Sequence, residues 1–80
     1  MPTVRFWAGA RSLAGRTDHH IEPGPLADVL ASVGREFGPQ LVSLLDRSVL
    51  LLDGVRVDRA SNPLVSSGSC LEVLPPYAGG

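Results

Sequence analysis

The chain has 80 residues, of which 44% are hydrophobic, and its formal net charge at pH 7 is -1. This composition indicates one small packed domain and excludes a disordered chain. Seven basic residues against eight acidic ones lack the basic excess of an electrostatic nucleic-acid binder. No apolar run is long enough to span a membrane, and no signal-peptide pattern is visible. A single cysteine excludes an internal disulfide, so we expect a protein of the reducing cytoplasm.

The N-terminal segment predicts a β-hairpin with a long loop. Apolar and polar residues alternate over residues 3–8, which is typical of a half-buried strand. Residues 9–16 contain two glycines and predict a connection with room for one helical turn. Residues 17–22 predict a second, weaker strand that carries His19 and Ile21 on one face.

An amphipathic helix is expected after this hairpin. Pro25 suits the first helical position, and apolar residues recur at spacings of three and four from Leu26 to Phe37. The Gly-Pro pair that follows should end the helix, because proline does not fit a helix interior. Residues 39–45 predict a second, short helical piece.

The C-terminal half has the period of strands. Residues 49–52 form a short apolar run, and the Asp53-Gly54 pair before residues 55–57 is a strong hairpin signal. The last strand is expected at residues 70–74, where two prolines end it.

These elements predict an α+β domain, with a mixed sheet of four to five strands and one main helix packed on one face. The first and last strands are the longest and most apolar, so we expect them side by side and parallel at the sheet centre. A parallel pair needs a crossover, which the helix supplies. Leu71 and Val73 should face the core, and Cys70, Glu72 and Leu74 should face away.

The sequence resembles the ubiquitin-like sulfur carriers and, among them, most closely the small subunits of molybdopterin synthase. The opening VRFWAGARSLAG, the passage PLVSSGSCLEVLPP and the terminal diglycine carry this resemblance, which covers the whole chain. It implies a β-grasp (ubiquitin-like) domain at residues 1–76 and a flexible diglycine tail at residues 77–80. At a usual glycine frequency of roughly 7%, a diglycine occurs at a given place about 0.5% of the time.

The resemblance also implies the chemistry. The Gly80 carboxylate would be adenylated by an enzyme related to the ubiquitin-activating enzymes, which uses ATP, and then converted to a thiocarboxylate. A large synthase subunit would receive the tail, and the sulfur would pass to a pyranopterin precursor in molybdenum cofactor biosynthesis. The chain would be a non-catalytic sulfur donor without a bound cofactor or metal. Gly79 and Gly80 suit a narrow channel because they lack side chains, and Pro75 and Pro76 stiffen the start of the tail.

A docking surface is predicted on the sheet face opposite the helix. Alternation places Trp7 and Leu74 there, with Arg5, Arg56 and Glu72 around them. An aromatic residue and a leucine rimmed by charges are typical of a protein-binding site. The resemblance implies that both enzymes dock on this face and on the tail. The contact residues expected after the last strand are Pro75, Pro76, Tyr77 and Ala78.

Several alternatives stay open at this point. Trp7 has an alternative place in the core, under the loop around Leu13. The sulfur has alternative acceptors in cysteine, thiamine, tRNA or natural-product pathways. A ubiquitin-like protein modifier is a further alternative from another functional class. The sequence names neither the activating enzyme nor the acceptor.

Two residue types are predicted to have no chemical role. His19 and His20 are adjacent on a strand and point to opposite faces, so they do not chelate one metal ion together. Cys70 has no basic partner that the sequence reveals and begins the last strand, far from the tail, so a structural thiol is expected.

Overall fold

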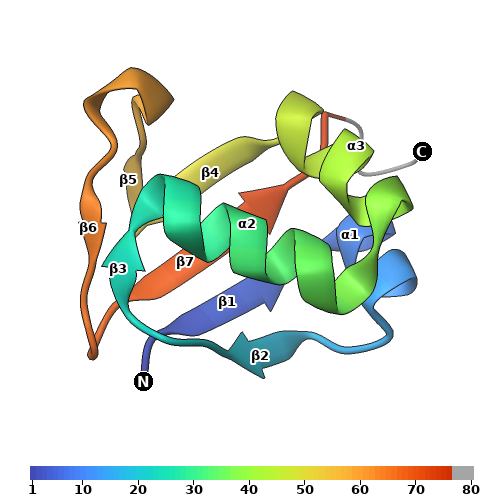
Figure 1. Ribbon diagram of the computed structural model, residues 1–80. Helices are drawn as coiled ribbons and strands as arrows, with labels where there is room; N and C mark the ends of the chain where they lie inside the picture. The colour runs from blue at the N-terminus through green and yellow to red at the C-terminus, as the bar shows by residue number, and fades with distance from the viewer. Residues whose placement is uncertain (77–80) are drawn as a thin grey trace.

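The computed structural model describes residues 1–76, and the predicted tail at residues 77–80 lies outside the described residues. A five-stranded mixed sheet of order β2-β1-β7-β4-β5 carries helices on one face (Figure 1). This confirms the predicted α+β class and number of strands. The elements are β1 (Thr3–Phe6), α1 (Ala8–Ala14), β2 (Asp18–His20), β3 (Gly24–Pro25), α2 (Leu26–Phe37), α3 (Pro39–Arg47), β4 (Val49–Leu52), β5 (Val55–Arg56), the 3-10 helix η1 (Arg59–Ser61), β6 (Leu64–Val65) and β7 (Cys70–Leu74).

The first and last strands are parallel neighbours at the sheet centre, as predicted. β1 pairs with β7 from Thr3 opposite Cys70 to Phe6 opposite Val73. On the other side β4 runs antiparallel to β7. Phe6, Leu71 and Val73 are fully buried, so the inward face of both central strands is the core face. Each fully buried valine, leucine or phenylalanine contributes about 1.5–3 kcal/mol to folding.

Two consecutive helices cover the core face. The apolar stripe of α2 buries Leu26, Val29 and Val33 against the sheet. α2 ends at Phe37, and the next residue, Gly38, has a φ of 94° that favours glycine. α3 runs to Arg47, two residues beyond the predicted piece, and packs against the same core. Within residues 1–76, neither of these helices nor α1 is long and apolar enough to cross a membrane.

The first strand is shorter than predicted, and the connection after it is a helix. β1 ends at Phe6 rather than at residue 8, because Ala8 adopts a φ of 47° and turns the chain. Ala10 is fully buried, which anchors α1 on the core. Gly15 closes α1 with a φ of 75°, and its N–H donates to the Arg11 carbonyl oxygen over 2.9 Å. Of the two glycines, Gly9 therefore lies inside a seven-residue helix and Gly15 directly follows it, so they do not mark a loop.

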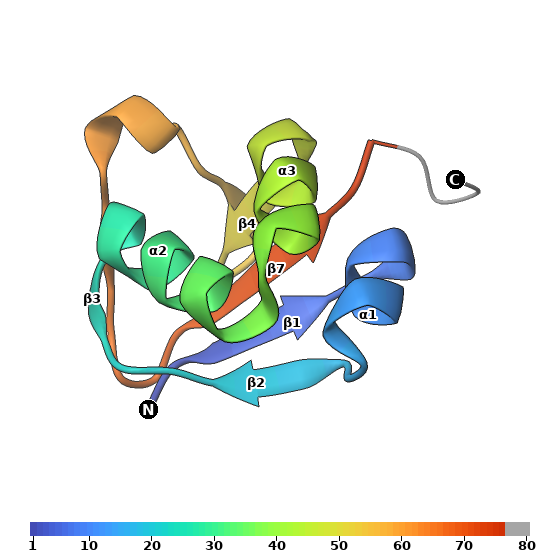
Figure 2. The ribbon, with the colours of Figure 1, turned by 45° about the vertical axis from the view of Figure 1, so that its right-hand side comes forward.

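A second sheet of two short strands was not predicted. β3 and β6 are antiparallel, and Pro25 lies opposite Leu64. The Leu26 N–H donates to the Pro63 carbonyl oxygen over 2.8 Å where α2 begins. Pro25 therefore precedes α2 as a strand residue and is not its first helical residue. Two-residue strands are too short for side-chain alternation to reveal them. Figure 2 shows this pair at the end of the molecule opposite α1.

The other differences concern strand ends. β2 covers residues 18–20 instead of 17–22, although Ile21 beyond it is buried as expected. β5 covers residues 55 and 56 instead of 55–57. Val57 still donates its N–H to the Leu50 carbonyl oxygen, so the hairpin contact continues one residue past the strand.

Gly34 is the point of closest approach between α2 and α3. A Cβ atom added there would lie 2.7 Å from Val42 Cγ2, which is closer than van der Waals contact allows. We expect Gly34→Ala to lower the free energy of unfolding by about 1–3 kcal/mol through overpacking, despite the better helix propensity of alanine. Urea denaturation measures this change.

Two variants control for the helix propensity. Gly9→Ala in α1 meets only Leu44 Cδ2 at 3.7 Å, an ordinary contact, and should be neutral or stabilising. Val42→Ala combined with Gly34→Ala should recover most of the loss, because the clashing methyl group is gone. A Gly34→Ala protein as stable as the parent would contradict the assigned contact.

Candidate functional site

The sheet face opposite α2 and α3 carries a continuous row of side chains, which we call the outer face. Cross-strand register aligns Asp18, Arg5, Glu72, Leu51 and Arg56, one from each strand in spatial order. Their sequence neighbours on the central strands point into the core, so these side chains point outward. The views in Figures 1 and 2 agree that α2 and α3 lie on the other side of the sheet.

Trp7 is an exposed member of this surface and not a core residue. Its backbone N–H donates to the Val73 carbonyl oxygen over 3.2 Å, which continues the pairing one residue beyond β1. Its indole Nε1–H donates to Glu72 Oε2 over 2.9 Å. The residue is 40% exposed, so the alternative position under the loop around Leu13 is wrong. The bond to Glu72 fixes the orientation of an aromatic side chain that solvent reaches.

Leu74 extends the apolar part of the outer face next to Trp7. It is half-buried and lies opposite Val49 of β4 in the antiparallel register. Val49 and Leu51 are half-buried on the same face, and the sequence reasoning missed both. It took residues 49–52 as one continuous apolar run and did not divide the run between two faces. Alternation separates these two outward residues from the buried Leu50.

The two predicted arginines lie in different places. The Arg5 guanidinium makes a bidentate ion pair with Asp18, with Nε 2.8 Å from Oδ1 and Nη2 3.2 Å from Oδ2. This contact lowers the pKa of Asp18 and raises that of Arg5. Arg56 is exposed at the opposite sheet edge, and β4 separates it from Glu72. The structure therefore brings Arg5, Trp7 and Glu72 together and places Arg56 apart from them.

The chain leaves the outer face at the C-terminal end of β7. Pro75 is half-buried and Pro76 is exposed directly after Leu74. The other predicted tail residues lie outside the described residues: Tyr77, Ala78, Gly79 and Gly80. Their roles stay predictions.

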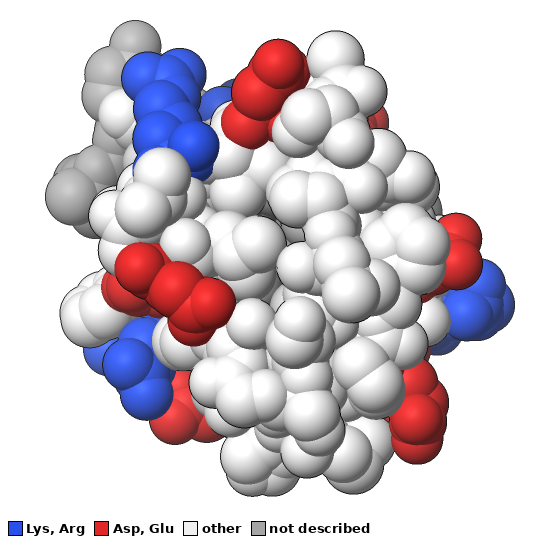
Figure 3. Space-filling view, turned by 90° about the vertical axis from the view of Figure 1, so that its left-hand side faces the viewer, with Lys and Arg blue, Asp and Glu red and all other residues white. Residues whose placement is uncertain are grey.

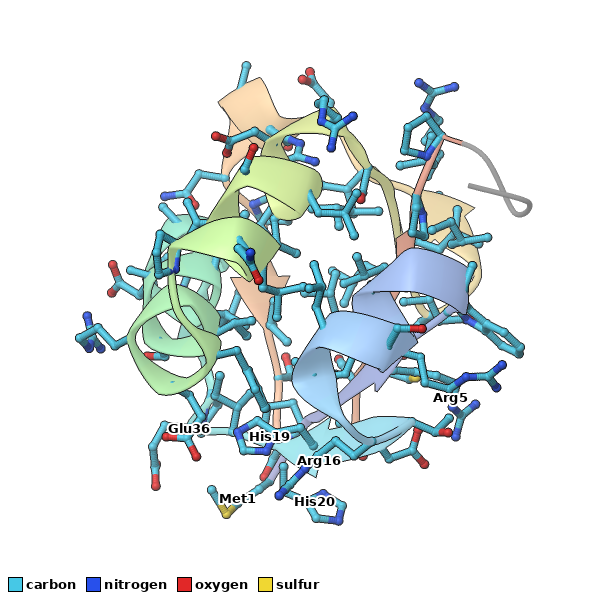
Figure 4. All side chains as sticks on the ribbon, turned by 90° about the vertical axis from the view of Figure 1, so that its right-hand side faces the viewer. Met1, Arg5, Arg16, His19, His20 and Glu36 are labelled. Carbon is cyan, nitrogen blue, oxygen red and sulfur yellow. The ribbon has the colours of Figure 1, made fainter. Side chains whose placement is uncertain are left out.

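The structure gives Cys70 and the two histidines separate surroundings. Burial raises the pKa of the half-buried Cys70 thiol, which lowers its thiolate fraction at neutral pH. The His19 ring packs 4.9 Å from the Phe37 ring on the helix side, whereas His20 Nδ1 lies 3.4 Å from Thr3 Oγ1. Figure 4 shows His19 beside Arg16 and His20 directed away. Residues 1–76 contain no group of three or more His, Cys, Asp or Glu side chains that could hold a metal ion.

The Arg5–Asp18 pair predicts a pH effect. Because the pKa of Asp18 is lower in the folded state, its stabilisation is complete above the unfolded pKa and is lost as the pH falls through the folded pKa. We expect NMR titration of the Asp18 carboxyl to give a value below 3.8. Arg5→Gln should return it toward that value, while Arg16→Gln should leave it unchanged. If the pKa of Asp18 is the same in Arg5→Gln as in the parent, the proposed pairing is wrong.

Neither the family models nor the curated protein sequences contain a match to this chain. Solved structures do match it. Small archaeal modifier protein 1 of Methanosarcina acetivorans is 20% identical with a TM-score of 0.83, over 99% of this chain and 95% of that one. The corresponding protein of Haloferax volcanii is 19% identical with a TM-score of 0.81, over 99% and 98%.

A third match concerns a two-protein assembly. The complex of subunits 1 and 2 of the molybdopterin-converting factor of Helicobacter pylori contains a chain that is 23% identical, with a TM-score of 0.70. The match covers 99% of this chain and 97% of that one. At these identities the likeness concerns the fold. The chain therefore has the β-grasp, ubiquitin-like fold of these proteins, and the resemblance to ubiquitin-like sulfur carriers is confirmed at the level of the fold.

Proposed function

We propose that this chain is a sulfur carrier of the molybdopterin synthase type, whose C-terminal carboxylate at Gly80 is converted to a thiocarboxylate. The observation that carries the proposal is a diglycine that begins five residues after the central strand β7 of a β-grasp domain. The match to a putative molybdopterin converting factor subunit 1 of Pyrococcus furiosus, with a TM-score of 0.72, supports this choice. So does the fold match to a chain of the Helicobacter pylori complex.

The chemistry needs an activated acyl carbon, because a carboxylate is a poor electrophile. A carboxylate oxygen of Gly80 attacks the α-phosphorus of ATP in the activating enzyme and displaces pyrophosphate. Hydrosulfide then attacks the acyl carbon of the mixed anhydride, the C–O bond to AMP breaks, and a proton is lost. The product is a thiocarboxylate in which sulfur replaces one oxygen. The carrier provides only the acyl group, and ATP is used by the partner enzyme.

We infer that the activating enzyme and a large synthase subunit both dock on the outer face. The exposed Trp7 and the half-buried Leu74 offer an apolar contact at the C-terminal end of β7. Glu72 and Arg5 border it with opposite charges, which suits an interface with a polar rim. Delivery to a pyranopterin precursor would then make this chain the small, non-catalytic subunit. Its location in the cytoplasm stays a prediction.

A second candidate function is protein modification through the same tail. The matches to small archaeal modifier proteins, with TM-scores of 0.83 and 0.81, favour it. The activated Gly80 acyl group would then be transferred to a lysine amine of a target instead of to sulfur. The chain contains no lysine, so lysine-linked chains of this protein would not form. Covalent conjugates in cell extracts would distinguish this candidate from a carrier for any sulfur pathway.

The tail chemistry can be measured by intact mass. With a matching activating enzyme, ATP and sulfide, we expect the mass to rise by about 16 Da, because sulfur replaces oxygen. Deletion of Gly80 should abolish the gain and leave the fold intact. Cys70→Ser is the matched control and should load fully, because the thiol takes no part. A truncated protein that still gains the mass, or a folded Cys70→Ser protein that does not, would overturn the assignment.

Docking can be tested at Trp7. We expect Trp7→Ala to weaken binding to the large synthase subunit by about 2 kcal/mol or more. Calorimetry of the variant and of the parent measures this difference. Val42→Ala on α3 is the matched control, since Val42 is 39% exposed on the opposite side and should have no effect. Circular dichroism should show both variants folded. Equal binding by Trp7→Ala and the parent would exclude the outer face as the docking site.

A further inference from the structure

At the edge strand β5, one backbone N–H and one backbone carbonyl group are directed away from the sheet. The Val57 N–H donates to the Leu50 carbonyl oxygen over 2.9 Å, so these two residues occupy the register of a hydrogen-bonded antiparallel pair. Such pairs alternate with pairs that are not hydrogen-bonded, and Arg56 opposite Leu51 is the next position. The backbone N–H and carbonyl of Arg56 therefore point away from β4. Because β5 is the last strand in the order, they point out of the sheet edge.

A pocket opens beside this edge, between β5 and the segment that leads into β6. Its volume is about 190 Å3, which accommodates one large apolar side chain. Val55 and Val57 alternate with Arg56, so their side chains lie on the helix side of the sheet, together with Leu52. The lining residues are Leu52, Val55, Arg56, Val57, Asp58, Ser61 and Pro63.

Arg56 and Asp58 are the charged residues of the pocket lining, and the surface beside it over β6 is apolar and uncharged. Val55 and Leu64, which are 70% and 64% exposed, are the most exposed large hydrophobic residues of the part of the chain that the structure describes. No charged residue occurs between Arg59 and Glu72. Figure 3 shows this end of the molecule as an uncharged area with the charged side chains around its margin. Exposed apolar area of this kind is typical of a site that a partner covers.

We propose that β5 and this pocket bind an extended segment of a partner protein by strand addition, at a sheet edge that β4 separates from Glu72 and Trp7. The segment pairs with the free N–H and carbonyl of Arg56 and becomes a new edge strand. One of its apolar side chains fills the pocket. The next residue along it points to the outer face, where an acidic side chain meets the exposed Arg56 guanidinium.

The charge of Arg56 decides between a foreign strand and a second copy of this chain. Two β5 strands that paired antiparallel through their free groups would place Arg56 opposite Arg56. Like charges directly opposite destabilise such a pair. The complementary occupant is therefore an acidic and apolar strand of another protein.

This surface lies away from the exit of the tail. In the register of β4 with β7, Val49 lies opposite Leu74, and Leu52 lies opposite Leu71. The β4–β5 turn is therefore at the end of β7 where the strand begins, and the tail leaves from the other end. A strand bound to β5 leaves Trp7 and the C-terminal end of β7 uncovered, so two partners can be bound at once.

A cyclic hairpin peptide whose edge strand contains Thr-Glu-Leu-Thr is the probe, titrated into the 15N-labelled full chain. We expect saturable amide shifts at residues 55–58 and 61, and slower hydrogen exchange at Arg56. The matched control peptide has lysine in place of glutamate. Arg56→Glu should weaken binding of the glutamate peptide and strengthen that of the lysine peptide, each by about three- to tenfold. Val55→Asp should weaken both peptides by about tenfold or more.

Both substitutions change exposed side chains, and the amide spectrum of each variant reports whether the fold is kept. A peptide with a methylated backbone nitrogen at the pairing position should not bind, because it no longer donates. The proposal is wrong if this peptide binds as well as its parent, if the shifts fall on Arg5 and Glu72, or if no shift saturates. Concentration-dependent dimerisation of the free chain through β5 would equally overturn it, since the occupant would then be a second copy.

Discussion

The parallel pairing of β1 with β7 is the constraint on which the other features depend. Parallel strands need a connection that crosses one face of the sheet, and the chain between them contains both α2 and α3. Those helices cover one face and bury its side chains. The other face carries no helix formed by residues 1–76, and it displays the row from Asp18 to Arg56. The same pairing brings Trp7 to the end of β7, where the tail departs.

The outer face combines an apolar contact with side chains that are already held in place. Trp7 is tied to Glu72 across the two central strands, and Arg5 is tied to Asp18 at the edge. The exposed Arg5–Asp18 ion pair adds little to stability, and the Trp7–Glu72 contact is an exposed hydrogen bond. Their effect on binding is different, because a side chain that is ordered before association loses less freedom on docking. The contacts thus favour recognition more than folding.

Sequence patterns predicted the parts of the fold whose side chains follow one period. Alternation in the first and last strands and the stripe from Leu26 to Phe37 were sufficient for the central sheet and α2. Only one helical turn of α1 was predicted, because the alternation continues to residue 8 in the sequence, whereas the φ of 47° at Ala8 turns the chain there. β3 and β6 escaped prediction because two residues define no period, and their pairing joins segments about 40 positions apart in the chain.

In the candidate site, too, sequence patterns predicted only what depends on the alternation of side chains along a strand. Alternation placed Trp7 and Leu74 on the face opposite the helix, which the structure confirms. The hydrogen bond from Trp7 to Glu72 joins residues 65 positions apart, and no local pattern encodes it. The assignment of Arg56 to the surroundings of Trp7 failed for the same reason, because the distance across the sheet depends on strand order.

Strand order also relates the two surfaces of this chain. A carrier with one tail presents its terminal carboxyl group to one enzyme at a time, so an activating enzyme and an acceptor that share the outer face exclude each other. β5 lies two strands from β7 and faces a different direction. In the proposed arrangement a partner strand held there would stay bound while the enzymes exchange on the outer face. In this proposal the four-residue strand β4, which lies between Glu72 and Arg56, separates the two binding surfaces.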